Sequence, residues 1–157
     1  MRRVILFNEN YVFEKEGKKE NVTLPHTWNA VDGQSASDYY RGECTYTKSF
    51  AKPELHAGEE LYLEINGANS SSEVSLNGKV LAAHDGGYST YRVNLTNELL
   101  DTNELQIKVD NSPNDHVYPQ KADFTFYGGL YRDVKLITVA GSHFDLDYYG
   151  GKGFYVT

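Results

Sequence analysis

The stretch that decides the fold runs from Glu73 to Ala83 and reads Glu-Val-Ser-Leu-Asn-Gly-Lys-Val-Leu-Ala-Ala. Asn77-Gly78 stands between two runs that are rich in apolar residues. A two-residue type I′ turn needs positive φ at both central positions, and Asn followed by Gly meets this need most readily. The sequence therefore predicts a β-hairpin with strands over Glu73–Leu76 and Lys79–Ala83.

The same β pattern extends along most of the chain. Leu61–Ile65 and Leu105–Val109 alternate between apolar and polar residues, which is typical of strands buried on one face. Thr45–Phe50 and Tyr131–Thr138 supply further strands, and one helical turn is expected after Thr96, whose hydroxyl would cap it. Many short strands separated by turns, with no long amphipathic helix, predict an all-β fold, a jelly-roll β-sandwich.

Size and composition fit one β domain that binds a neutral partner. The 157 residues suffice for a single domain with a core, and the 13 Tyr and 7 Phe favour strands. The formal net charge of −7 argues against nucleic acid or an anionic membrane surface as a partner.

The N-terminus and the single thiol together predict a cytoplasmic location. The apolar run Val4–Phe7 is too short for the core of a signal peptide, and no stretch approaches the length of a membrane span. Cys44 is the only cysteine, so it cannot form an internal disulfide, which fits a reducing compartment. The acceptor sequences at Asn21, Asn69 and Asn94 are therefore expected to carry no glycan.

The segment Asp123–Val134 carries the clearest chemical signal and reads Asp-Phe-Thr-Phe-Tyr-Gly-Gly-Leu-Tyr-Arg-Asp-Val. The pair Gly128-Gly129 allows positive φ and close approach of backbones, so the residues before it can turn out of a sheet edge and leave Asp123 projecting. A carboxylate accepts hydrogen bonds from sugar hydroxyls, and aromatic rings cover the apolar face of a sugar. This loop is therefore a candidate sugar-binding site.

This segment closely resembles the end of the N-terminal sugar-binding domain of glycoside hydrolase family 2, the β-galactosidase family. Leu24-Pro25-His26-Thr27-Trp28-Asn29 and His84-Asp85-Gly86-Gly87-Tyr88 resemble two further motifs of that domain. The resemblance implies a galactose-binding-domain-like jelly roll over residues 1–140. It also implies that residues 141–157 are a linker and the start of an immunoglobulin-like domain that lies beyond this sequence.

The resemblance also implies substrate-binding residues. Asp123 falls on the acidic residue with which this domain contacts substrate hydroxyls; the alternative is an Asp that caps the turn. Arg41 lies where a polar side chain of some members reaches toward the substrate, although its five donors equally suit a neighbouring acid. Glu43, two residues on, is a weaker candidate for the same role. This stretch departs from some better-known members of the family, which carry Asn nearby.

Other polar residues of these motifs are predicted to be structural. His26 has no nucleophile or acid beside it in a recognisable catalytic arrangement, so His26 and Trp28 are expected to anchor a loop. His84 with one neighbouring acid offers too few ligands for a metal site. Asp133, which follows Arg132, is expected to be structural, in an exposed or interfacial pair.

Hydrolysis of a glycosidic bond normally takes two carboxylates about 5 Å or about 6.5–9.5 Å apart. The resemblance implies that both lie on a barrel domain downstream, so we expect no catalytic residue, metal site or cofactor in this chain. It allows a monovalent cation and Mg²⁺ in the intact enzyme. The implied partners are a β-galactoside and the downstream immunoglobulin-like and barrel domains, in an intact enzyme that can be a homo-oligomer.

The resemblance favours hydrolysis of terminal β-galactosides as the activity of the intact protein. The ending Gly129–Val134 is galactosidase-like, whereas glucuronidase counterparts tend to have Pro where Asp133 stands. β-Glucuronidase and β-mannosidase of the same family are alternatives. A free-standing carbohydrate-binding module is an alternative from a different class of protein.

Overall fold

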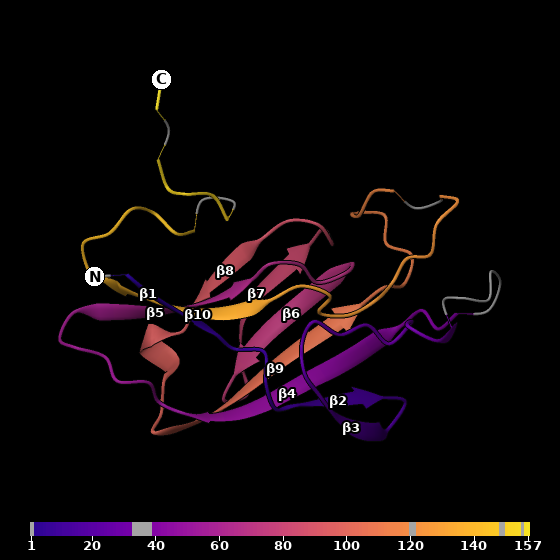
Figure 1. The fold of residues 1–157 in the computed structure, drawn as a ribbon, viewed down its shortest axis with the longest axis horizontal. Coiled ribbons are helices and arrows are strands. Elements are labelled where there is room, and N and C mark those ends of the chain that lie inside the picture. The colour runs from indigo at the N-terminus through magenta and orange to yellow at the C-terminus, as the bar shows by residue number, and fades with distance from the viewer. Residues whose placement is uncertain (1, 33–38, 120–121, 148–149, 155) are drawn as a thin grey trace.

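The computed structural model describes the whole chain except residues 1, 33–38, 120, 121, 148, 149 and 155. The described residues form two antiparallel sheets packed face to face, which confirms the predicted all-β sandwich (Figure 1). The four-stranded sheet has the order β1 (Arg3–Leu6), β10 (Val134–Ala140), β5 (Glu59–Ile65) and β8 (Tyr91–Asn94). The six-stranded sheet has the order β3 (Lys18–Val22), β2 (Tyr11–Lys15), β4 (Glu43–Ala51), β9 (Thr102–Asp110), β6 (Ser71–Leu76) and β7 (Lys79–Asp85).

The hydrophobic core fills the space between the sheets because every second residue of the inner strands points into it. β4, β6 and β9 alternate between buried and more exposed residues along their length, as one-sided strands should. The fully buried side chains come from both sheets and include Tyr11, Tyr46, Leu61, Leu63, Ile65, Val74, Leu76, Leu105 and Ile107.

The hairpin around Asn77-Gly78 forms as predicted and joins β6 to β7. Asn77 has φ 53° and Gly78 has φ 81°, the two positive values that a type I′ turn requires. The Asn77 side chain also bonds the turn to β9 and to the segment before it. Its Oδ1 accepts from Glu104 N–H at 2.9 Å, and its Nδ2 donates to Glu98 O at 2.9 Å.

A second hairpin, between β2 and β3, was not predicted from the sequence. Its turn, Glu16-Gly17, has φ values of 50° and 77°, the same left-handed pair as the predicted hairpin. β3 is almost entirely exposed and polar, so it lacks the alternation that identifies a strand.

The helical turn after Thr96 is present, but the predicted cap was wrong. A 3₁₀ turn spans Thr96–Glu98, with Leu95 at its N-terminal boundary and no side-chain cap. The Thr96 hydroxyl instead accepts a hydrogen bond from Leu61 N–H at 2.9 Å. Because β8 ends just before this turn, the backbone of β5 needs another partner there, and Thr96 supplies it.

The described residues of the tail after β10 lie over the outer face of the four-stranded sheet (Figure 1, yellow). Leu146 is buried there against Tyr62, Ile137 and Val139. Arg92 holds the tail by donating from Nη1 to Leu146 O at 3.0 Å and Gly151 O at 2.8 Å. The division into residues 1–140 and a linker over 141–157 stays a prediction.

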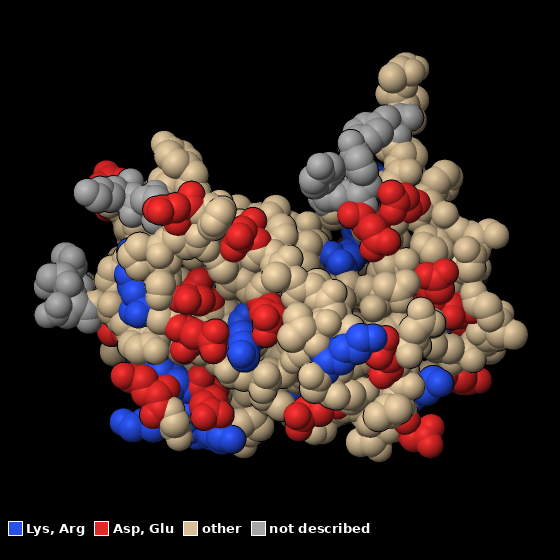
Figure 2. Space-filling model, turned by 180° about the vertical axis from the view of Figure 1, so that it is seen from behind, with Lys and Arg blue, Asp and Glu red and all other residues tan. Residues whose placement is uncertain are grey.

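Figure 2 shows acidic and basic side chains intermixed on one face of the molecule, without a continuous basic area on that face. Within the residues that the structure describes, none of the helical segments is long and apolar enough to cross a membrane.

Candidate functional site

Loop 111–133, between β9 and β10, meets loop 23–42, between β3 and β4, at one end of the sandwich (Figure 1, right). The contact includes a backbone hydrogen bond from His26 N–H to Leu130 O at 2.8 Å. Two of the three motifs that carry the family resemblance, Leu24–Asn29 and Asp123–Val134, are therefore packed against each other.

The Gly-Gly pair is required by this packing. A Cβ on Gly128 would lie 1.9 Å from Cζ2 of Trp28. Gly129 has a φ of +127°, and a Cβ on it would lie 2.5 Å from His26 O. Trp28 is only 8% exposed and stacks on Phe13 at 5.9 Å between ring centroids. The turn closes onto the tryptophan because neither glycine has a side chain.

Two fully buried asparagines join the loops behind this turn. Asn29 Oδ1 accepts from Gly128 N–H at 2.8 Å and from Asn111 Nδ2 at 3.2 Å. Asn111 Nδ2 also donates to Phe126 O at 2.8 Å, while its Oδ1 accepts from Gly42 N–H at 2.9 Å. Buried polar groups require such partners, so this pair fixes the base of the candidate loop. This pair was not predicted, because nothing in the sequence distinguishes a buried Asn from an exposed Asn of a loop.

Asp123 stands at the start of this fixed segment with an exposed side chain. Its carboxylate makes no hydrogen bond or ion pair with any described residue, so it caps no described turn. Phe124 and Phe126 follow it and pack ring to ring, with centroids 5.1 Å apart. The side chain of Asp123 is therefore exposed, as expected, and no described residue uses its capacity to accept hydrogen bonds.

Arg41 lies beneath the aromatic part of the loop. Its Nε donates to Asn111 O at 2.7 Å, and its guanidinium carbon lies 4.9 Å from the ring centroid of Phe126. Among the described residues its partners are thus a carbonyl and an aromatic face, and the alternative of a neighbouring acid stays untested. Arg41 supports the ring of Phe126 while Asn111 holds the backbone of the same residue.

Glu43 lies apart from the group formed by Arg41 and Phe126. It begins β4, is exposed on the outer face of the six-stranded sheet, and has its Oε1 3.9 Å from Lys108 Nζ. It lines a surface depression there with Glu73 and Asp110, in which Arg41 takes no part. Its role in substrate binding stays a prediction.

His26 has the contacts of a structural residue, as predicted. Its Nδ1 is 2.8 Å from Tyr46 Oη, and its ring packs on Phe13 at 4.7 Å between centroids. Burial lowers the pKa of His26 from its ordinary value. The neutral imidazole is therefore part of the packing that holds loop 23–42.

His84 is also structural. Its ring stacks on Tyr91 at 4.3 Å between centroids, and its Nε2 is 2.8 Å from Ser89 Oγ. Burial lowers the pKa of His84. Nowhere in the described parts of the chain do three or more His, Cys, Asp or Glu side chains gather as metal ligands.

Asp133 is structural but is not paired with its neighbour in the sequence. Its Oδ1 accepts from Asn8 Nδ2 at 2.9 Å. Arg132 turns away and donates to Tyr88 O at 3.1 Å, with its guanidinium 5.2 Å from the ring centroid of Tyr131. Asp133 therefore joins the N-terminal segment to the start of β10.

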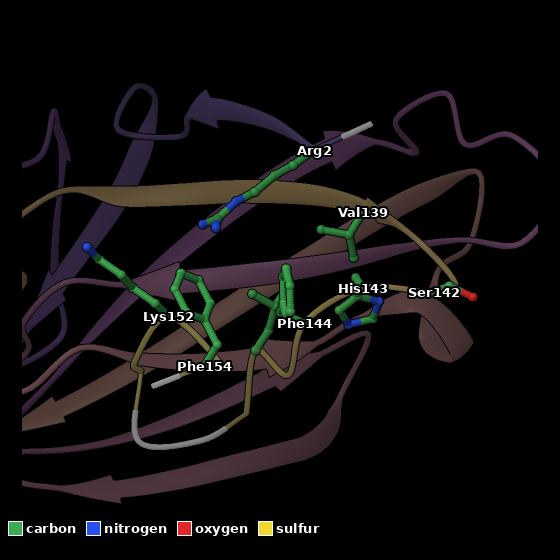
Figure 3. Close-up of a pocket in the computed structure, with 8 residues that line it drawn as sticks. Arg2, Val139, Ser142, His143, Phe144, Lys152 and Phe154 are labelled. Atoms are coloured by element: carbon green, nitrogen blue, oxygen red, sulfur yellow. The ribbon is translucent and has the colours of Figure 1, made fainter. Parts of the chain in front are cut away.

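A cleft of about 310 Å³ opens beside the Asp123 loop and was not predicted. Its lining is Thr27, Asn69, Tyr88, Thr125, Tyr127 and Tyr131. A larger hollow of about 590 Å³ lies under the tail, away from this loop (Figure 3). Its lining includes two phenylalanines, Phe144 and Phe154, and two cationic side chains, Arg2 and Lys152.

Comparison with known proteins places this arrangement in a family. Residues 14–137 match the family described as glycosyl hydrolase 2 galactose-binding domain-like. A β-glucuronidase of Bacteroides fragilis is 36% identical over 87% of this chain and 21% of that protein. A β-galactosidase of Thermoanaerobacterium thermosulfurigenes is 30% identical over 87% of this chain and 21% of that protein.

A solved structure shares the fold closely. The FMN-binding β-glucuronidase from Facaelibacterium prausnitzii L2-6 superposes with a TM-score of 0.92 at 46% identity, over 96% of this chain and 24% of that one. The 157 residues thus span roughly a fifth of the length of the two curated relatives above. The chain belongs to the glycosyl hydrolase 2 galactose-binding domain-like family.

Proposed function

We propose that this domain forms one wall of the substrate pocket in a family 2 glycosidase and presents Asp123 to the sugar. The observation that carries the proposal is an exposed carboxylate, without a described partner, at the start of a loop whose base is fixed by two buried asparagines. A carboxylate accepts hydrogen bonds from sugar hydroxyls, and the fixed base of the loop lowers the entropic cost of orienting the sugar ring.

The domain's own residues would bind and position, and the bond-breaking carboxylates would come from another part of a longer protein. Arg41 would act as a positioning residue, since it supports Phe126 within the loop that Asp123 begins. Glu43 would contribute only if a partner domain brings substrate to the outer face of the sheet. A monovalent cation and Mg²⁺ are proposed for the longer enzyme alone.

The substrate class is a terminal β-glycoside, and we put β-glucuronides before β-galactosides. The galactosidase preference drawn from Asp133 stays a prediction, because relatives of both names match this chain. The relative named β-glucuronidase has the higher identity of the two, at 36% against 30%. A β-mannoside is the third candidate.

The test is turnover by the longer protein with nitrophenyl β-glucuronide, β-galactoside and β-mannoside under the same conditions. Higher catalytic efficiency on the glucuronide supports the order proposed, and higher efficiency on the galactoside reverses it. No turnover of any of the three contradicts the glycosidase proposal. The 157-residue chain alone should hydrolyse none of them.

A free-standing carbohydrate-binding module is the alternative, and affinity separates the two proposals. One wall of a pocket buries little of a monosaccharide, so its dissociation constant for the isolated domain should be millimolar or weaker, roughly 4 kcal/mol or less of binding free energy. Calorimetry that finds micromolar binding of galactose or lactose to the 157 residues would favour the module.

A second candidate function is binding of flavin mononucleotide, because the similar structure at 46% identity is described as FMN-binding. The hollow under the tail has a suitable lining (Figure 3). Phe144 and Phe154 are 68% and 48% exposed and lie 5.1 Å apart, so they offer ring faces to a flavin. Arg2 and Lys152 offer cations to a phosphate.

FMN fluorescence, titrated with the 157-residue chain, tests this second candidate. Quenching that saturates, and that weakens in both Phe154→Ala and Lys152→Ala, supports a flavin site in this hollow. Phe124→Ala removes an exposed ring at the other end of the sandwich and is the matched control. Quenching that is absent, or that the control weakens as much, removes the candidate.

A further inference from the structure

The cleft beside the Asp123 loop is built from four separate parts of the chain. Thr27 comes from the loop before β4, Asn69 from the loop after β5, and Tyr88 from the loop after β7. Tyr127 and Tyr131 come from the segment that leads into β10. The cleft holds about 310 Å³, at the low end of the range of small-molecule sites.

The floor of the cleft is fixed by hydrogen bonds between these segments. Asn69 is only 6% exposed; its Nδ2 donates to Tyr127 O at 2.6 Å, and its backbone N–H donates to Gly129 O at 3.1 Å. Tyr131 Oη donates to Gly87 O at 2.5 Å. The cleft is therefore held open by contacts that do not involve a ligand.

The walls combine aromatic rings with free hydroxyls. Tyr88 is 55% exposed and Tyr127 is 39% exposed, and neither hydroxyl bonds to any described residue. A tyrosine presents an apolar ring and a polar tip, and this combination matches a pyranose, which has C–H groups on its faces and hydroxyls around its rim. Because both rings are exposed to water, covering them with a sugar gains little binding free energy, and the affinity should be low.

The lining is uncharged, and this decides the ligand class. All six residues around the cleft are Tyr, Thr or Asn. A uronate or a phosphate would bury its charge without a counter-charge here, which is costly. Two described cations lie near the cleft but outside its lining: Arg132 is engaged with Tyr88 O, Asn66 O and the ring of Tyr131. Arg41 lines a neighbouring depression with Asn69 and Tyr88 and donates to Asn111 O.

We propose that this cleft is a second sugar subsite, which binds a neutral hexose unit next to the sugar at Asp123. The position of this subsite beside the substrate pocket rests on the proposed function. Its ligand is different, because it would bind a neutral pyranose unit of a larger substrate and not the sugar that contacts Asp123. Thr125 and Tyr127 follow Asp123 in the same loop, so one oligosaccharide can reach both sites.

Saturation-transfer NMR on the 157-residue chain tests the subsite apart from catalysis. With about 10 mM ligand, suited to millimolar affinity, methyl β-galactoside should receive saturation and glucuronate should not. Tyr88→Ala and Tyr127→Ala should each weaken binding about tenfold, equivalent to about 1.4 kcal/mol. Tyr88→Phe keeps the ring and should retain most of the binding. Phe144→Ala removes an exposed ring under the tail and should leave binding unchanged.

Asp123→Ala distinguishes this proposal from the proposed function. It should lower turnover by the longer enzyme, whereas the part of the methyl β-galactoside binding that Tyr88→Ala and Tyr127→Ala remove should persist in the 157-residue Asp123→Ala chain. Equal saturation of glucuronate and the neutral sugar, binding to the Asp123→Ala chain that survives the added double variant Tyr88→Ala/Tyr127→Ala, or no binding by the unaltered chain would overturn the subsite. Unchanged melting temperatures in both tyrosine variants exclude unfolding as the cause of lost binding.

Discussion

Gly128 lies against the six-membered ring of Trp28, at a place where a Cβ would be 1.9 Å from Cζ2. The two residues are 100 positions apart and belong to two of the three motifs by which the sequence resembles its family. This contact explains why one motif has a Trp and the other a Gly-Gly pair. The turn can pack on the flat ring only if its own residues have no side chain.

Gly128→Ala should therefore strongly destabilise the domain. The neighbour is a ring already stacked on Phe13, so it cannot move aside, and overpacking of this kind costs about 3 kcal/mol. Urea unfolding measures the loss. Gly78→Ala is the control: a Cβ there meets nothing within 4 Å, and only the positive φ is strained, at about 1 kcal/mol. Equal losses in the two variants would contradict the packing argument.

Asn111→Asp should lower the free energy of unfolding at neutral pH by about 2–3 kcal/mol. The carboxylate has nearly the same shape, but it cannot donate to Phe126 O or Asn29 Oδ1, and both acceptors are then left without that partner. Asn97→Asp makes the same change on an exposed residue and should shift stability by no more than about 0.5 kcal/mol. A small effect at Asn111 would mean that the loop base is held by other contacts.

The parts of this molecule that were predictable are those in which local sequence and global fold agree. Asn77-Gly78 specifies its own turn, and Leu105–Val109 specifies a strand with one buried face. The β2–β3 hairpin was missed because its turn, Glu16-Gly17, is not a typical pair and β3 buries almost nothing. The site followed the same rule: the exposed position of Asp123 was expected from the Gly-Gly pair in the same short segment. The Asn29–Asn111 contact joins distant residues through tertiary structure alone.

Arg92→Met should release the tail from the four-stranded sheet. Arg92 and Glu64 form an ion pair at 2.7 Å with side chains only 7% and 9% exposed, and Arg92 also donates to two tail carbonyls. Loss of one partner of a buried pair typically costs about 3–5 kcal/mol, and the cost should be at the low end here because Glu64 Oε1 keeps Lys135 Nζ at 3.7 Å. Trypsin should then cut faster after Lys152. Lys79→Met breaks an exposed pair with Glu98 and should leave that rate unchanged.

His26 should make stability depend on pH. Burial lowers its pKa in the folded protein, whereas the unfolded chain keeps a value of about 6.5. Just below that pH the unfolded chain binds a proton that the folded one does not, so stability is full above about pH 6.5 and falls as the pH drops. Urea unfolding from about pH 7.5 to pH 5.5 should show this fall, and His26→Gln should reduce it. The exposed His116→Gln is the control, and an equal reduction there would contradict the assignment.

Asp123→Ala should lower the catalytic efficiency of the longer enzyme at least about tenfold and leave the melting temperature of the 157-residue chain almost unchanged. A charged acceptor bonded to a sugar hydroxyl is worth about 1.5–3 kcal/mol. Substitution of an exposed loop residue that has no described partner shifts stability by no more than about 0.5 kcal/mol. Asp115→Ala changes another exposed loop acid and should alter neither quantity. If Asp123 instead stabilised the turn, the order would reverse: the chain would lose stability, and turnover per folded molecule would stay normal.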